Sequence, residues 1–110
     1  MTTVAVQDKF AEILTTFGDL QESVNAALQC YTIEQITTKI SELRQKDSEY
    51  QTRYRLEYPA FSQRTAEDEE FVQHIESNIN KMWEMDLVDW EFCYKGIDDW
   101  TRKLQDILLT

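Results

Sequence analysis

The spacing of apolar residues predicts that the first half of the chain is helical. A first stripe advances in steps that keep its members on one side of an α-helix, and it consists of Val6, Phe10, Ile13, Leu14, Phe17, Leu20, Val24, Ala27, Leu28 and Tyr31. A second stripe alternates steps of three and four, and it consists of Ile33, Ile36, Ile40, Leu43, Asp47, Tyr50 and Tyr54. This second spacing is typical of a coiled-coil seam, interrupted only by Asp47.

The two stripes are not expected to belong to one straight helix. The step from Tyr31 to Ile33 turns the apolar side by about 200°. Thr32 fits a helix N-cap, with Gln35 at the capping-box position. We therefore predict a turn at Tyr31–Thr32 between two antiparallel helices of about 25 residues each.

The only proline marks the second predicted turn. Pro59 disfavours a helical conformation at Tyr58, so the second helix is expected to end near Glu57. Residues 58–64 are expected to form a loop. Thr65 then offers an N-cap for a further helix, and the acidic residues that follow suit the positive end of the helix dipole.

A third stripe predicts a long C-terminal helix over residues 66–108. Its members lie within about 100° of arc on a helix: Val72, Ile75, Ile79, Trp83, Leu87, Trp90, Tyr94, Ile97, Leu104 and Leu108. The helix is either continuous or broken at Asp86, which fits an N-cap. The predicted fold is all-α: an antiparallel helical bundle of two helices of about 25 residues and one long C-terminal helix, forming a single domain over residues 1–110.

A second apolar row interrupts the amphipathic pattern of the C-terminal helix. Met85, Val88 and Phe92 lie on the side opposite Trp83 and Trp90, and Gly96 continues the row. A helix that is apolar on two sides is either wrapped by its own neighbours or contacts a partner. We interpret Met85, Val88 and Phe92 as a partner interface.

The charge limits the classes of partner. The chain carries 21 acidic and 11 basic residues, a net charge of −10, which opposes direct binding to nucleic acid. No apolar run is long enough for a membrane span, and no secretory signal is visible, so we expect no membrane association and a cytoplasmic location. Cys30 and Cys93 are expected to be reduced and buried. The expected partners are a second copy, giving a homodimer, or another protein, with basic proteins among the candidates.

No residue pattern predicts a catalytic, cofactor-binding or metal site. Trp83 and Trp90 lie on the main stripe and are expected to be core residues rather than a stacking platform. The only histidine, His74, lies on the side opposite that stripe, and no second ligand or activating partner converges on it. We expect an exposed histidine and no cofactor.

Two pairs of carboxylates give the alternative enzymatic hypothesis. Glu67 and Glu70 stand three residues apart, and Asp86 and Asp89 repeat that spacing. The arrangement is similar to the E-x-x-E and E-x-x-D motifs of all-α MazG-type nucleotide pyrophosphatases, although Asp86 stands where that pattern has Glu. The resemblance covers residues 67–89 and implies a metal-dependent nucleotide phosphohydrolase that holds Mg²⁺ against a triphosphate.

Three functional hypotheses therefore remain. The first and favoured one is a non-enzymatic interaction or assembly module that uses its C-terminal helix, an antitoxin-like neutraliser of a basic protein being one form of it. The second is the phosphohydrolase, and the third is a purely structural bundle within a larger assembly. Asp47 is either paired with a base or placed at the wet end of the bundle, and we favour the wet end.

Overall fold

The computed structural model describes residues 2–109, which form five α-helices and contain no strand. The helices are α1 (Asp8–Thr15), α2 (Leu20–Tyr54), α3 (Tyr58–Glu67), α4 (Glu69–Asn78) and α5 (Trp83–Leu109). The all-α class predicted from the sequence is confirmed. Within the described residues, no helix is long and apolar enough to cross a lipid bilayer.

The chain divides into two compact units, residues 1–35 and residues 36–110. Helix α2 begins in the first unit and ends in the second, so its two halves have different surroundings. Each unit is described below by itself. The single domain expected from the chain length stays a prediction.

The first unit contains α1 and the first half of α2 and buries no side chain among residues 2–35. Helix α1 ends before Gly18, whose φ of 137° lies in a region that side chains rarely adopt. Asp19 then caps α2 by accepting a hydrogen bond from the amide of Glu22, at 3.1 Å. The predicted helix through residues 6–31 is therefore interrupted at the glycine.

The predicted turn at Tyr31–Thr32 is wrong, because α2 is continuous from Leu20 to Tyr54. Thr32 does not cap a helix; its hydroxyl donates to the carbonyl oxygen of Leu28, at 2.7 Å, one turn earlier. The change of apolar side requires no bend, since the first stripe is not packed into a core. Tyr31 remains 61 % exposed, and the buried residues of α2 begin at Ile36.

The predicted loop over residues 58–64 is also wrong, because these residues belong to α3. Pro59 lies in the first turn of α3, where its missing N–H and fixed φ are tolerated. The chain instead turns just after Tyr54, at Arg55, which has a φ of 58°. Thr65 lies within α3, and the N-cap of α4 is Asp68, which accepts a hydrogen bond from the amide of Phe71 at 3.1 Å.

The long C-terminal helix is broken, but not at Asp86. Residues 79–82 separate α4 from α5, and the side chain of Asn80 accepts a hydrogen bond from the amide of Met82 at 2.9 Å. Asp86 lies inside the first turn of α5. Since the apolar stripe continues in phase across the break, its spacing did not indicate where the helix ends.

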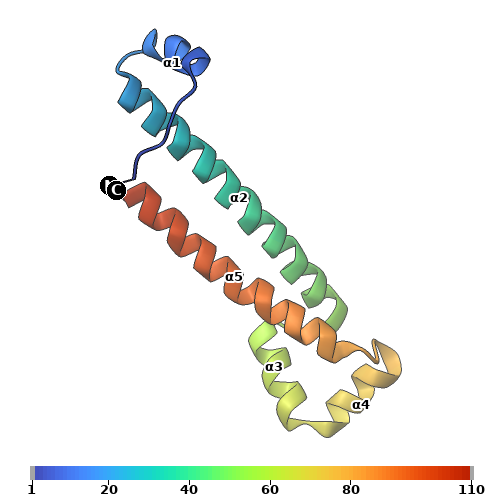
Figure 1. Cartoon of the computed structure of the whole chain (residues 1–110). Coiled ribbons are helices and arrows are strands. Elements are labelled where there is room, and N and C mark those ends of the chain that lie inside the picture. Colours follow the sequence, from blue (N-terminus) through green and yellow to red (C-terminus); the bar gives the residue numbers. More distant parts are fainter. Residues whose placement is uncertain (1, 110) are drawn as a thin grey trace. The chain divides into compact units, whose positions relative to one another are not determined.

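The second unit has an aromatic core to which four helices contribute. Tyr54 of α2, Phe61 of α3, Ile75 of α4, and Trp83 and Trp90 of α5 form one buried cluster. Trp90 is fully buried, with its ring centroid 5.1 Å from that of Phe61 and 6.0 Å from that of Tyr54. Figure 1 shows α3 and α4 at one end of the pair formed by α5 and the second half of α2. The core lies where these four segments meet, and it fixes the orientation of α5.

Candidate interaction surface

Polar contacts between α2 and α5 join the two helices in antiparallel register. The indole N–H of Trp90 donates to Asp47 at 2.7 Å, and the hydroxyl of Tyr50 donates to Asp89 at 2.5 Å. Residue numbers on α2 rise while those on α5 fall, so the helices run in opposite directions. Asp47 was expected to be either paired with a base or at the wet end; it instead binds a buried indole.

Asp86 accepts three hydrogen bonds at the end of this contact. Its Oδ2 atom lies 2.6 Å from Nη1 of Arg53, 2.5 Å from the hydroxyl of Tyr54 and 3.1 Å from Nδ2 of the Asn80 side chain. Burial alone would raise the pKa of Asp86, but the hydrogen bonds from Tyr54, Arg53 and Asn80 outweigh it and lower that pKa. The bonds also link the start of α5 to the end of α2 and to the connecting loop.

The pKa values of the two neighbouring tyrosines shift in the opposite direction, upward. Burial and the nearby Asp89 carboxylate raise the pKa of Tyr50. Burial and the hydrogen bond to Asp86 raise the pKa of Tyr54. Both phenols therefore stay protonated and act as hydrogen-bond donors to the carboxylates of α5.

The opposite side of α5 carries the apolar row, which consists of Met85, Val88 and Phe92. These side chains are 64 %, 67 % and 65 % exposed, whereas Trp90 and Cys93 on the inner side are fully buried. Met82, just before the helix, is also exposed. The prediction that the row contacts a partner stays a prediction, but the row is not packed against other parts of the described chain.

Gly96 does not continue the row, contrary to the sequence-based expectation. A Cβ atom added at Gly96 would lie 3.0 Å from Cδ1 of Leu43 on α2. Gly96 thus permits the close approach of α5 to α2. The apolar row ends instead at Lys95, which forms an ion pair of 2.6 Å with Glu91.

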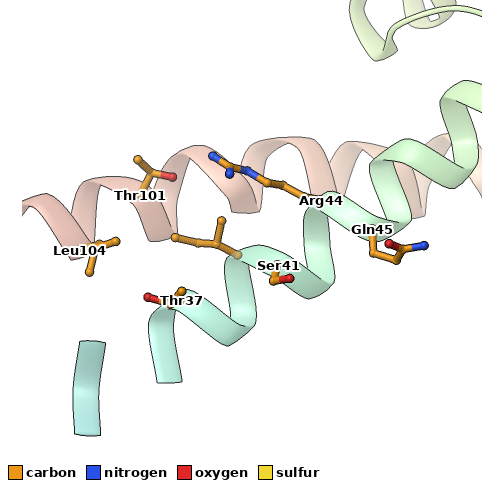
Figure 2. Close-up of a pocket in the computed structure, with 7 residues that line it drawn as sticks. Thr37, Ser41, Arg44, Gln45, Thr101 and Leu104 are labelled. Atoms are coloured by element: carbon orange, nitrogen blue, oxygen red, sulfur yellow. The ribbon is translucent and has the colours of Figure 1, made fainter. Parts of the chain in front are cut away.

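A shallow hollow of about 440 Å³ lies farther along the same two helices. Figure 2 shows Thr37, Ser41, Arg44 and Gln45 on α2 and Thr101 and Leu104 on α5. Its lining combines three small hydroxyl side chains, Gln45 and the cation of Arg44 with the apolar side chains of Ile40 and Leu104. The lining residues do not place a nucleophile beside a general acid or base.

The carboxylates of the enzymatic hypothesis lie on three different helices. Glu67 ends α3 and Glu70 lies in the first turn of α4, whereas Asp86 and Asp89 lie on α5 and bind residues of α2. Within residues 2–109, no three His, Cys, Asp or Glu side chains are grouped so that they could hold a metal ion. The geometry therefore lends no support to a shared Mg²⁺ site.

The remaining candidate residues are placed mostly as predicted. Trp83 and Trp90 are core residues, and His74 is exposed, with its ring nitrogen 3.0 Å from the side-chain nitrogen of Asn78. Cys93 is buried as expected, and its burial raises the pKa of its thiol. The prediction that Cys30 is buried is wrong, because it lies exposed in the first half of α2.

Sequence reasoning missed a second group of exposed apolar residues. In the first unit, five large side chains of the first stripe are about half or more exposed: Phe10, Ile13, Phe17, Leu28 and Tyr31. Their spacing resembles that of a buried stripe, so it contains no signal that distinguishes the two. It also missed the residues of α2 that bind α5, namely Tyr50, Arg53 and Tyr54. The available signal was the presence of tyrosines on the apolar seam, because a partly buried phenol needs a hydrogen-bond acceptor such as an aspartate.

The chain matches no protein-family model, no curated protein sequence and no solved structure.

Proposed function

We propose that this protein is a non-enzymatic interaction or assembly module that binds a partner protein, or a second copy of itself, through α5. The observation that carries the proposal is the exposure of the apolar row, Met85, Val88 and Phe92, at 64 %, 67 % and 65 %. Complete burial of each such side chain contributes about 1.5–3 kcal/mol before the costs of association. Because about two thirds of each side chain is exposed, the three together offer roughly 3–6 kcal/mol, so they can form the apolar centre of an interface whose other contacts offset the costs of association.

The position of α5 supports the proposal because the row lies on a rigid base. The inner side of the helix is fixed by the aromatic core and by the hydrogen bonds of Asp86 and Trp90 to α2. A preorganised surface loses little conformational entropy on binding. Met85, at the start of the row, adds an adaptable contact surface, since its unbranched side chain fits differently shaped partners.

The antiparallel bundle expected from the sequence forms part of the same proposal. In the second unit, α5 has neighbours on its inner side, from α2, α3 and α4. A partner helix along the apolar row would surround α5 on its other side and complete such a bundle. The cytoplasmic location also remains a prediction.

The test is a comparison of complexes formed by the wild type and by a variant with Val88→Glu and Phe92→Glu. We expect the variant to lose the protein that co-purifies with the tagged wild type, or to become monomeric in sedimentation if the wild type is a dimer. A matched control, Leu108→Glu with Leu109→Glu, adds two carboxylates to exposed positions of the same helix away from the row.

Circular dichroism and tryptophan fluorescence verify that each variant is folded, because Trp90 is fully buried. Retention of every complex by a folded row variant would refute the proposal. Unfolding of the row variant alone would show that the row belongs to the core.

A further inference from the structure

The charges beside the apolar row indicate which kind of partner the row binds. This inference rests on the function proposed above. Glu84, Glu91 and Asp98 recur every seven residues and therefore line one side of the row along α5. Asp89 lies on the other side, where it binds Tyr50 and has Nζ of Lys46 at 3.9 Å. Lys81 precedes the row, and Lys95 follows it and pairs with Glu91.

A second copy of α5 does not complement these charges. Met85, Val88 and Phe92 correspond to positions a, d and a of a heptad, so Glu84 and Glu91 take position g and Asp89 takes position e. In an antiparallel pair, position g of one helix faces position g of the other, which places glutamate against glutamate. In a parallel pair, position g faces position e, which places Glu84 against Asp89 of the second copy. Like charges at these positions oppose both pairings.

A basic helix complements the same surface in either direction. Its lysines or arginines would lie beside Glu84, Glu91 and Asp89, while its apolar residues cover the row. We infer that the occupant of the apolar row is an amphipathic α-helix of another protein, with apolar residues at coiled-coil spacing and basic residues on both sides. The inference selects a basic heteromeric partner over the homodimer.

The experiment uses the full chain and a pair of synthetic amphipathic peptides. One peptide carries leucines at positions a and d and lysines at positions e and g, and its matched control has glutamate in place of each lysine. We expect the wild type to be monomeric in sedimentation and to bind the lysine peptide at least roughly tenfold more tightly than the glutamate peptide, since several ion pairs act together. We also expect added salt to weaken the binding.

Two sets of variants separate the apolar contribution from general attraction of charges. Val88→Glu with Phe92→Glu makes the chain more acidic, so a purely electrostatic attraction would strengthen, whereas binding on the row should weaken by roughly tenfold or more. Glu84→Lys with Glu91→Lys should reverse the preference between the two peptides. Glu84→Gln with Glu91→Gln serves as the milder variant and should reduce the preference. The control at Leu108 and Leu109 should bind the lysine peptide at least as well as the wild type.

Three outcomes would overturn the inference. A wild-type dimer that the Val88 and Phe92 variant dissociates, and that the lysine peptide does not displace, would identify a second copy as the occupant while leaving the proposed function intact. Equal or tighter binding of the lysine peptide to that variant would show that the peptide is held by electrostatic attraction alone and does not contact the apolar row. Binding of neither peptide by a monomeric wild type would exclude a basic helix, and the proposed function would then be judged separately by the co-purification test.

Discussion

Asp47 shows how one polar residue on an apolar seam acquires a structural role. Its Oδ1 atom accepts the hydrogen bond of the fully buried Trp90 indole, at 2.7 Å, and its Oδ2 atom accepts one from Gln51, at 2.8 Å. A buried indole N–H without an acceptor is costly, because the group has given up its hydrogen bond to water. The carboxylate thus allows a tryptophan to occupy the centre of the core.

The role of Asp47 predicts the effect of its removal. Asp47→Leu should destabilise the protein by about 1–3 kcal/mol, because the Trp90 N–H loses its acceptor. Asp47→Asn retains an amide oxygen at the same position and should lose less. Urea unfolding followed by tryptophan fluorescence measures both variants. A neutral or stabilising Asp47→Leu would instead support the wet-end position.

The three hydrogen bonds of Asp86 predict a dependence of stability on pH. The pKa of Asp86 is lowered from 3.8, so its stabilising contribution is fully present above that value. The contribution is lost as the pH falls through the lower pKa of the folded state. Asp86→Asn should be less stable than the wild type at neutral pH by about 1.5–3 kcal/mol, the contribution of a hydrogen bond to a charged group.

The measurement is the difference in unfolding free energy between wild type and Asp86→Asn over a range of pH. This difference should be constant above pH 5 and shrink as the pH falls below about 4, near the ordinary pKa of an aspartate. Other carboxylates titrate in both proteins, so their contributions cancel in the difference. A difference independent of pH would contradict the lowered pKa.

Helix ends provide a matched pair of predictions at the level of the elements. Asp68 caps α4 through the amide of Phe71, whereas Thr32, which resembled an N-cap in the sequence, lies in the middle of α2. Asp68→Ala should cost about 0.5–2 kcal/mol. Thr32→Ala should be neutral or slightly stabilising, because alanine has the higher helix propensity. Urea unfolding and helix content by circular dichroism test both, and a loss of helix content at Thr32→Ala would indicate a true cap there.

The sequence was sufficient to predict the class of the elements but not their ends. The scarcity of Gly and Pro and the steps of three and four predicted helices, and the five helices agree. The change of phase at Tyr31 was read as a turn because both stripes were assumed to be buried. Only the contacts of each half of α2 distinguish a buried stripe from an exposed one, and those contacts are non-local.

The apolar row of the candidate surface could be predicted from the spacing of residues, but its exposure could not. Met85, Val88 and Phe92 form a row only if residues 85–92 are helical, and that helix is confirmed. Their exposure requires in addition that no other segment covers them, which the spacing alone does not indicate. Gly96 illustrates the difference, since its place in the row depended on how closely α2 approaches α5.

At the scale of the whole molecule, the two halves of α2 should differ in local stability. The second half of α2 has four buried side chains, Ile36, Ile40, Leu43 and Tyr54, whereas residues 20–35 have none. Short helices without tertiary packing are only marginally stable in water. Amide hydrogen exchange should therefore be slow over residues 43–54 and fast over residues 20–35. Uniform protection along α2 would show that the first half has a packing partner in solution.

A helix shared between a unit with a core and a unit without one also determines how the protein melts. Helix–coil loss over the first half of α2 is gradual, whereas the aromatic core unfolds cooperatively. All three tryptophans lie beyond residue 80, so their fluorescence reports the second unit, and Trp83 and Trp90 report its core. Ellipticity at the helical band should decline on warming before the fluorescence changes, and the two signals will give different apparent midpoints. A single midpoint temperature therefore does not describe this chain, and a ligand that stabilises only the first unit would change the ellipticity without changing the tryptophan fluorescence.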